Sequence, residues 1–319
     1  MDQRRQIAPT VAWNTKDTTV HLLSVPNFES ANGVVGLDGT PTKRMWDTAF
    51  GVSFDHERVV PEERMNDYLT DALDIHVHQY GAHNDNGGTR PYSSGVHLYA
   101  DTDEKLLHGM GMHFDAEPDV ITTKAAIRRY DEDDRVLHHA DEYRNFASVK
   151  SSNAFRESTL GAVLGSPHPG DETFKRWGAF MGLPIRRLGD NSPDDKGPNL
   201  EYGRTGDEIY QHYVHNQVLQ SILRFGRDGQ EAHVLVTSMC TPSWVEPEPL
   251  TMTTFNGADR RVIGCLRDTD GRTQSEIVDE TGMDQGNVSR SLTGLEEQGF
   301  VGIGGTDNSG NLRRTWEGV

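Results

Sequence analysis

The chain has 319 residues and a mass of 35.5 kDa, which is enough for about two domains. Its 49 acidic and 31 basic residues give a formal net charge of -18, and only 7 of the basic residues are lysines. Like charge in such excess repels itself in dilute buffer but is screened in molar salt. Because 25 aromatic residues are available for a core, the composition indicates a halophilic folded protein rather than an acidic disordered one.

The sequence also excludes several classes of protein. No apolar run approaches the length of a membrane span, and residues 1–10 lack the apolar segment of a signal peptide. We therefore expect a cytoplasmic protein without a membrane partner. The two cysteines, Cys240 and Cys265, are too few for a disulfide framework or a four-cysteine zinc site.

The first 245 residues predict an N-terminal segment followed by an α/β domain. Residues 1–30 contain one short expected strand, at 20–25. From residue 31 to 245, short apolar runs rich in β-branched residues alternate with longer polar stretches, which is typical of a mostly parallel sheet buried between helices. The expected strands are at 34–37, 96–99, 120–122, 160–164 and 234–237. Residues 246–258, which are rich in proline, predict a linker.

The last part of the chain, 259–319, predicts three short helices and a hairpin. The first helix places apolar side chains on one face, Thr273 and Glu276 have capping-box spacing before the second, and Asp284 can cap the third. The apolar face of the third helix has spacings of four and three. The core positions expected from this pattern are Val262, Ile263, Leu266, Val288, Leu292 and Leu295.

This pattern, and the run 273–301 in particular, resembles the winged helix-turn-helix domains of archaeal and bacterial DNA-binding proteins. The resemblance implies that the third helix enters the major groove and that the hairpin forms a wing. The expected DNA-binding residues are Gln285, Asn287, Ser289, Arg290, Arg313 and Arg314. Because residues 259–319 carry a net charge of -4, docking of another protein remains an alternative to DNA binding.

In the larger domain, Gln220, Arg224 and Arg227 have the Q-x-x-x-R-x-x-R spacing, which would place three polar groups on one helical face. Two guanidiniums and an amide so arranged could clamp a polyphosphate. The run resembles motif VI of superfamily 2 helicases of the DEAD/DEAH type, whose arginines act as fingers. One departure is Leu223, which stands where that motif has glycine.

Two further segments are similar to motifs of the same helicases. The strand and turn at 160–172 (LGAVLGSPHPGDE) resemble motif V, and GLDGTPT at 36–42 resembles motif III. The order of the three segments is the helicase order, and the chain resembles the C-terminal part, with the second RecA-like domain, of helicase or replication proteins of haloarchaeal plasmids, proviruses and chromosomes. The resemblance implies a RecA-like fold and a loop facing nucleotide or DNA, formed by Gly165, Ser166, Gly170, Asp171, Asp38 and Thr40.

The residues that would bind Mg-ATP are missing, because neither G-x-x-x-x-G-K-[ST] nor a correctly placed D-E-x-[HD] occurs. We therefore expect no cofactor on this chain alone, and ATP with Mg²⁺ only if a partner chain supplies the first RecA-like domain. Whether the protein is an enzyme stays open. His76, His78 and His83 lie close in sequence, but without an evident acidic ligand nearby we expect polar surface and no metal site.

The resulting hypothesis is a DNA-binding protein with a helicase C-terminal-like domain, acting in replication or maintenance of a mobile element or its host. The alternative is a winged-helix transcriptional regulator whose α/β domain is a sensor or dimerisation module. An inactive remnant of a split helicase gene is a third possibility. The motif VI spacing favours the first, and the missing phosphate loop favours the second.

Overall fold

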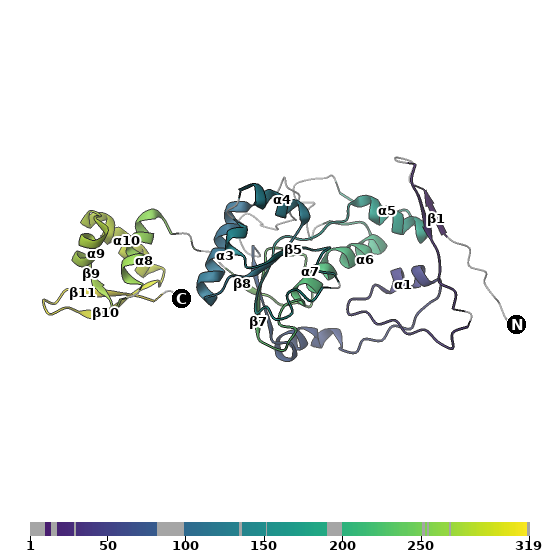
Figure 1. The fold of residues 1–319 in the computed structure, drawn as a ribbon, viewed down its shortest axis with the longest axis horizontal. Helices are drawn as coiled ribbons and strands as arrows, with labels where there is room; N and C mark the ends of the chain where they lie inside the picture. The colour runs from purple at the N-terminus through teal and green to yellow at the C-terminus, as the bar shows by residue number, and fades with distance from the viewer. Residues whose placement is uncertain are drawn as a thin grey trace. The chain divides into compact units, whose positions relative to one another are not determined.

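The structure, a computed structural model, describes residues 10–13, 18–28, 30–81, 99–133, 136–150, 152–189, 200–250, 253, 255–267 and 269–317. The chain forms two compact units, Met1–Thr251 and Met252–Val319. Figure 1 shows the helices and strands of both units.

The first unit is built on a six-stranded sheet whose paired strands are all parallel, in the order β5-β4-β6-β7-β3-β8. The strands are β3 (Ile75–Tyr80), β4 (Asp119–Thr122), β5 (Tyr143–Asn145), β6 (Leu160–Val163), β7 (Ala232–Val236) and β8 (Glu248–Leu250). Every residue of β6 is buried, because helices cover both faces of a parallel sheet. The predicted α/β class is confirmed, and the sheet is compatible with a RecA-like domain.

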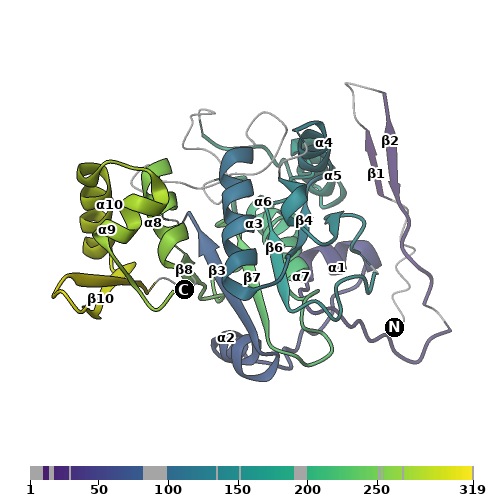
Figure 2. The same cartoon turned by 60° about the vertical axis from the view of Figure 1, so that its left-hand side comes forward.

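Helices lie on both faces of this sheet (Figure 2). α3 (Ala100–Phe114) and α4 (Lys124–Asp133) are joined by the Tyr130 hydroxyl, which donates to Asp103 at 2.6 Å. On the other face, α7 (His215–Ile222) packs Val218 and Ile222 against Val77 and its neighbours in the main core. α5 (Asp171–Phe180) and α6 (Arg204–Tyr213) precede α7 in the chain.

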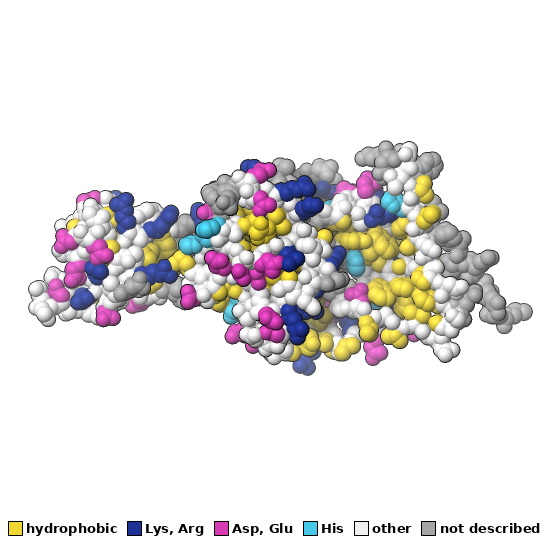
Figure 3. Space-filling view, viewed as in Figure 1, with side chains coloured by type: hydrophobic (Ala, Val, Ile, Leu, Met, Phe, Trp, Pro, Cys, Tyr) yellow, Lys and Arg dark blue, Asp and Glu magenta, His cyan; other side chains and the backbone are white. Residues whose placement is uncertain are grey.

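The N-terminal part of this unit packs beside α5 and α6. β1 (Thr10–Trp13) and β2 (Val20–Leu23) form an antiparallel pair, and α1 (Lys43–Phe50) buries Met45 beside Phe174 and Tyr210. Short helical turns follow at Glu62–Arg64 (η1), Met65–Asp67 (α2) and Tyr68–Ala72 (η2), with another at Leu137–His139 (η3). Figure 3 shows hydrophobic side chains gathered around α1 on the face in view.

One strand expected in this unit is not formed, and another lies mostly outside the described residues. Residues 34–37 form no strand, and Val35 and Leu37 are 86% and 92% exposed, since no strand pairs with this apolar run. The boundary between the two units, at Thr251 and Met252, falls within the expected linker at 246–258, which also contains edge strand β8 and the start of α8 (Gly257–Leu266). Of the strand expected at 96–99, only Tyr99 is described, just before α3.

The second unit has the predicted three helices and hairpin. They are α8 (Gly257–Leu266), α9 (Gln274–Thr281) and α10 (Gln285–Glu297), with a sheet of order β10-β11-β9 made by β10 (Val301–Thr306), β11 (Leu312–Trp316) and β9 (Arg272–Thr273). The Thr273–Glu276 capping box and the Asp284 cap are both formed. A second capping box, Asn256 with Asp259, begins α8 and was not expected.

The core of this unit explains why the apolar spacing in the sequence predicted the third helix. Val288, Leu292 and Leu295 are at most 1% exposed and pack with Ile277 and Val262. Of the expected core positions, Ile263 is only partly buried. Among the described residues of the whole chain, no helix has the length and apolar character needed to cross a bilayer.

Candidate functional site

The exposed side of α10 carries the residues predicted to contact DNA. Its apolar positions face the core, so Gln285, Ser289 and Arg290 are exposed and Asn287 is partly exposed. The helix begins where the Asp284 carboxylate accepts a hydrogen bond from the Asn287 backbone N–H at 2.9 Å. The first two turns therefore present amide, hydroxyl and guanidinium groups, which can bind base edges or phosphates.

Arg290 is aligned along this face by contacts within the helix. Its Nε donates to the Gly286 carbonyl at 3.3 Å, and its Nη2 donates to Oδ1 of Asn287. Asn287 Nδ2 in turn donates to the Asp284 carboxylate. Arg290 makes no ion pair with a described acidic side chain, so its charge is available to a ligand.

Arg313 and Arg314 lie on β11, the second strand of the hairpin that was expected to form the wing, rather than at the tip of the hairpin. Arg314 Nε forms an ion pair with Glu296 of α10 at 2.9 Å, and Arg313 Nη2 donates to the Gly271 carbonyl. These contacts hold the hairpin against α10 and the loop before β9, and DNA contact by the two arginines stays a prediction.

The hairpin turn itself is polar and carries no basic residue from 306 to 311. Asp307 accepts hydrogen bonds from the Asn311 side chain at 2.9 Å and from the backbone N–H groups of Asn311 and Ser309 at 2.8 Å each, and these contacts lower the pKa of its carboxyl. Exposed arginines that the sequence reasoning passed over lie elsewhere, on and after α8, at Arg260, Arg261 and Arg267. Their positions between apolar core residues of a helix were a signal that could have identified them.

Comparison with known proteins supports the fold of the second unit. Residues 254–307 match the MarR family. The C-terminal unit is a winged helix, and this part of it is similar to the MarR family. No helicase family matches the chain, and no curated protein or solved structure is significantly similar to it. A MarR-type domain makes DNA the supported partner, whereas a partner chain that completes a helicase is not shown.

The residues of the motif VI-like segment do not share a helical face. Gln220 is on α7, but this helix ends at Ile222, and Arg224 and Arg227 lie in the turns that follow. Arg224 Nη1 donates to the Ser152 carbonyl at 3.2 Å, while the Arg227 side chain is exposed. The expected clamp geometry on one helix is therefore wrong, because the helix is too short.

The motif V-like loop lies at the other end of β6 from these arginines. The Arg227 and Gly226 backbone N–H groups bond Arg156 and Ser158, which precede β6, whereas Gly165 and Ser166 follow it. The structure therefore does not bring Arg224 and Arg227 to the Gly165–Asp171 loop.

The polar groups of that loop are used within the protein. Gly165 N–H donates to Oγ1 of Thr237 at 2.9 Å, and Ser166, 1% exposed, hydrogen-bonds the Cys240 thiol. Gly170 adopts a φ of +85° and precedes α5. Asp171 accepts a hydrogen bond from the Tyr202 hydroxyl at 2.7 Å, and burial together with this carboxylate raises the pKa of Tyr202.

The motif III-like segment does meet α7. Gln220 Nε2 donates to Oγ1 of Thr40 at 2.7 Å, and Asn216 Nδ2 donates to the Thr40 carbonyl at 3.1 Å. Asp38 is exposed and accepts from the Thr40 backbone N–H and from Trp46 Nε1. Thr40 and Gln220, 180 positions apart in the sequence, are thus in contact. The order of the motif-like segments is consistent with this contact, but only the structure shows it.

A cavity of about 950 Å³ adjoins this contact. It lies where β3 and β7 end, because Gln79 from β3 and Met239 after β7 line it together with Thr40, His215 and Trp244. The carboxyl edge of a parallel sheet is the usual place for a ligand in α/β proteins. His215 Nε2 is buried without a hydrogen-bond partner among the described residues, and burial lowers the pKa of this side chain.

Proposed function

We propose that the protein is a cytoplasmic transcriptional regulator that binds duplex DNA through its winged helix. The exposed first half of α10, in a domain that matches the MarR family, is the observation that carries the proposal. In this proposal α10 enters the major groove, where Arg290 bonds a guanine or a phosphate and Gln285 and Ser289 contact neighbouring groups.

The acidic character of the chain does not oppose this proposal. A net charge of -18 is screened over about 3 Å in molar salt, so that only charges close to the DNA affect binding. Figure 3 shows basic and acidic side chains interspersed on the second unit. Under these conditions, hydrogen bonds from α10 to base edges would carry a large share of the affinity.

We assign the α/β unit a sensor role, supported by the cavity at the carboxyl edge of its sheet. The cavity has the size of a small-molecule site and combines apolar Trp244 and Met239 with the polar Gln79 and His215. A small polar molecule that raises the melting temperature of the first unit and changes DNA affinity would identify the signal.

The test of DNA binding uses the full-length chain in molar potassium chloride. A pool of randomised duplexes is first selected for bound sequences, and fluorescence anisotropy then measures their affinity. Arg290→Ala is expected to weaken binding by about 1–3 kcal/mol and to relax preference at one base pair. Arg129→Ala, which removes an exposed arginine of α4, is the charge-matched control and should leave affinity unchanged. Equal loss in both variants would contradict recognition by α10.

A second candidate function is the helicase-like role in replication or maintenance of DNA, favoured by the Thr40–Gln220 contact between the motif III-like and motif VI-like segments. In that role, ATP and Mg²⁺ would be bound only with a partner chain that carries the first RecA-like domain. Preference for forked or single-stranded DNA, lost on replacing Arg224 and Arg227 with alanine, would support it. Binding only to specific duplexes, with unchanged affinity in that double variant, would favour the regulator.

A further inference from the structure

Six ionisable side chains gather where β3, β7 and β8 lie side by side. Asp74 and Glu231 precede β3 and β7, respectively, and Glu248 begins β8. The register places His76 beside His233. This group, which we call the histidine cluster, consists of Asp74, His76, His78, Glu231, His233 and Glu248. The sequence reasoning missed it because the acidic residue nearest to His76 in space, apart from Asp74, is 155 positions away.

The face that carries the cluster is set by the alternation of β3. Ile75 and Val77 point into the main core, so His76 and His78 point to the opposite face, where the ring of Phe114 from α3 covers part of them. The Phe114 and His233 ring centroids are 4.5 Å apart. The imidazoles are therefore partly shielded, while the side chains of Asp74 and Glu231 remain 54% and 58% exposed. A small ion could enter from the carboxylate side.

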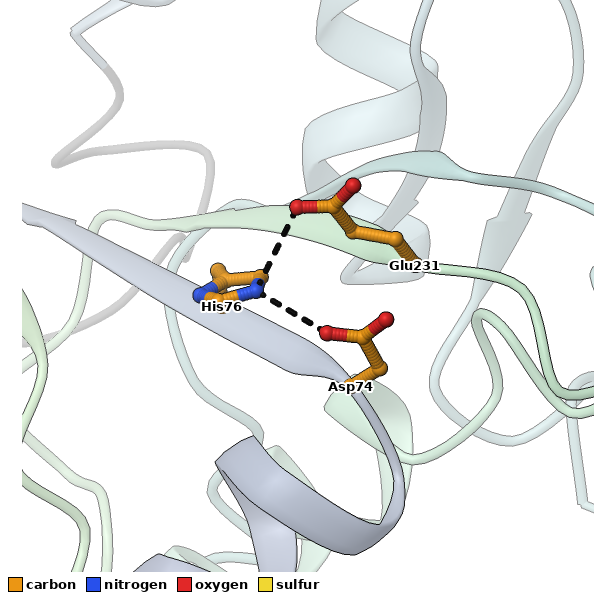
Figure 4. Close-up of side chains that lie close together, drawn as sticks. All are labelled: Asp74, His76 and Glu231. Atoms are coloured by element: carbon orange, nitrogen blue, oxygen red, sulfur yellow. Dashed lines mark hydrogen bonds and ion pairs between the residues drawn. The ribbon is translucent and has the colours of Figure 1, made fainter.

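The spacing of the ligand atoms fits a tetrahedral metal ion. His76 Nε2 lies 3.2 Å from Oδ1 of Asp74 and 3.4 Å from Oε1 of Glu231, and all three atoms are within 4.8 Å of one another (Figure 4). Zinc bonds nitrogen and oxygen at about 2.0–2.2 Å, which places ligands of a tetrahedral site about 3.4 Å apart. The two closest pairs already have this spacing.

A chain of hydrogen bonds fixes the tautomer of a second imidazole, that of His233. Glu248 lies 3.2 Å from Nδ1 of His78, so this nitrogen carries the proton and leaves Nε2 as an acceptor. His78 Nε2 is 3.0 Å from Nδ1 of His233, which must then donate. These tautomers, inferred from the bonding, leave a lone pair on Nε2 of His233.

That lone pair faces a carboxylate. His233 Nε2 is 3.5 Å from Oε1 of Glu231, the same oxygen that approaches His76. Two acceptors at this distance repel unless a cation lies between them. A metal ion held by Glu231 would remove this repulsion.

We propose that Asp74, His76 and Glu231 bind one zinc ion, and that a small shift of its ring brings His233 in as the fourth ligand, with His78 and Glu248 orienting it from behind. Two imidazoles and two carboxylates suit zinc among the divalent ions, whereas Mg²⁺ and Ca²⁺ prefer oxygen alone. An orienting carboxylate behind a metal-bound histidine is a common outer partner in zinc sites. The ion would tie the beginnings of β3 and β7 together, at the sheet edge opposite to the cavity.

The left-handed backbone of Asp74 supports this assignment. Its φ of 53° is uncommon for a residue other than glycine, and it carries the carboxylate to Nε2 of His76 two residues further on. Asp74 also accepts the Ala232 backbone N–H at 2.9 Å through its carbonyl, so both strands are fixed at this point. The two strands that supply the ligands are therefore already held in register.

The test uses the untagged full-length protein, stripped with chelator, in molar potassium chloride. Titrated Co²⁺ should give the visible absorption of a four-coordinate site at one ion per chain, and Zn²⁺ should displace it. Glu231→Gln and His76→Ala should each weaken binding at least about tenfold, the loss that even outer partners of metal ligands typically cause. Because Glu231 is exposed, Glu231→Gln is expected to fold, which circular dichroism would check.

A matched control is His138→Gln, which alters an exposed histidine in a separate group with His139 and should bind Co²⁺ as the parent does. Zn²⁺ should also raise the melting temperature of the parent and of this control, but not of Glu231→Gln. No stoichiometric Co²⁺ spectrum, equal affinity in Glu231→Gln, or loss of binding in His138→Gln would each overturn the proposal.

Discussion

At the scale of single residues, glycines show how position decides the sign of a substitution. Gly161 lies in the fully buried strand β6, where an added Cβ would stand 2.6 Å from Cε1 of Phe225. That ring is completely buried and stacks on Phe155 with centroids 5.6 Å apart, so it has no room to move. Gly264, by contrast, is exposed on α8 with no atom within 4 Å of such a Cβ.

Gly161→Ala should therefore destabilise the first unit by about 1–3 kcal/mol, the usual effect of overpacking a core. Gly264→Ala should stabilise the second unit by about 0.5–1 kcal/mol, since alanine restricts the unfolded chain and favours the helix. Urea unfolding with hydrogen-exchange mass spectrometry would assign each change to its unit. A destabilising Gly264→Ala would show that this face of α8 is covered.

At the scale of secondary structure elements, the beginning of α10 links stability to recognition. The Asp284 carboxylate caps the helix through the Asn287 backbone N–H and also accepts from the Asn287 side chain, which Arg290 contacts. One residue thus fixes the helix start and orients the side chains proposed to read DNA.

Asp284→Ala should cost about 1 kcal/mol of stability in the second unit, because the N-cap is lost. DNA affinity should fall with it, as Asn287 and Arg290 lose their alignment. Asp284→Asn, which retains a capping oxygen, should preserve stability. Thermal unfolding and anisotropy with the selected duplex measure the two effects. Unchanged DNA affinity in Asp284→Ala would show that the helix cap does not affect DNA recognition.

At the scale of the whole molecule, charge dominates. The chain has a formal net charge of -18. Most ion pairs among the described residues are exposed to solvent, and the pair of Arg314 and Glu296, with side chains 18% and 30% exposed, is one of the least exposed. Stability should therefore rise with potassium chloride as the screening length falls from about 10 Å at 0.1 M to about 3 Å at 1 M. Melting temperatures across this range would check it. A fall in melting temperature with added salt would show that attractive ion pairs outweigh repulsion.

The sequence by itself determined whatever depends on neighbours along the chain. The capping box at Thr273, the cap at Asp284 and the apolar face of Val288, Leu292 and Leu295 are local patterns, and together they specified the winged helix. The same holds for β4, β6 and β7, because their continuous apolar runs are typical of strands that are buried on both faces of a parallel sheet.

Only the tertiary structure decided which distant residues meet. In the folded chain, Thr40 bonds Gln220, and Arg224 and Arg227 lie beyond the end of α7. Arg314 forms an ion pair with Glu296. The fold also brings Glu231 to His76, because parallel strands far apart in the sequence lie side by side in the sheet. Spacing along a chain records a helical face or a strand alternation, but contacts across a parallel sheet depend on strand order, which no local pattern contains.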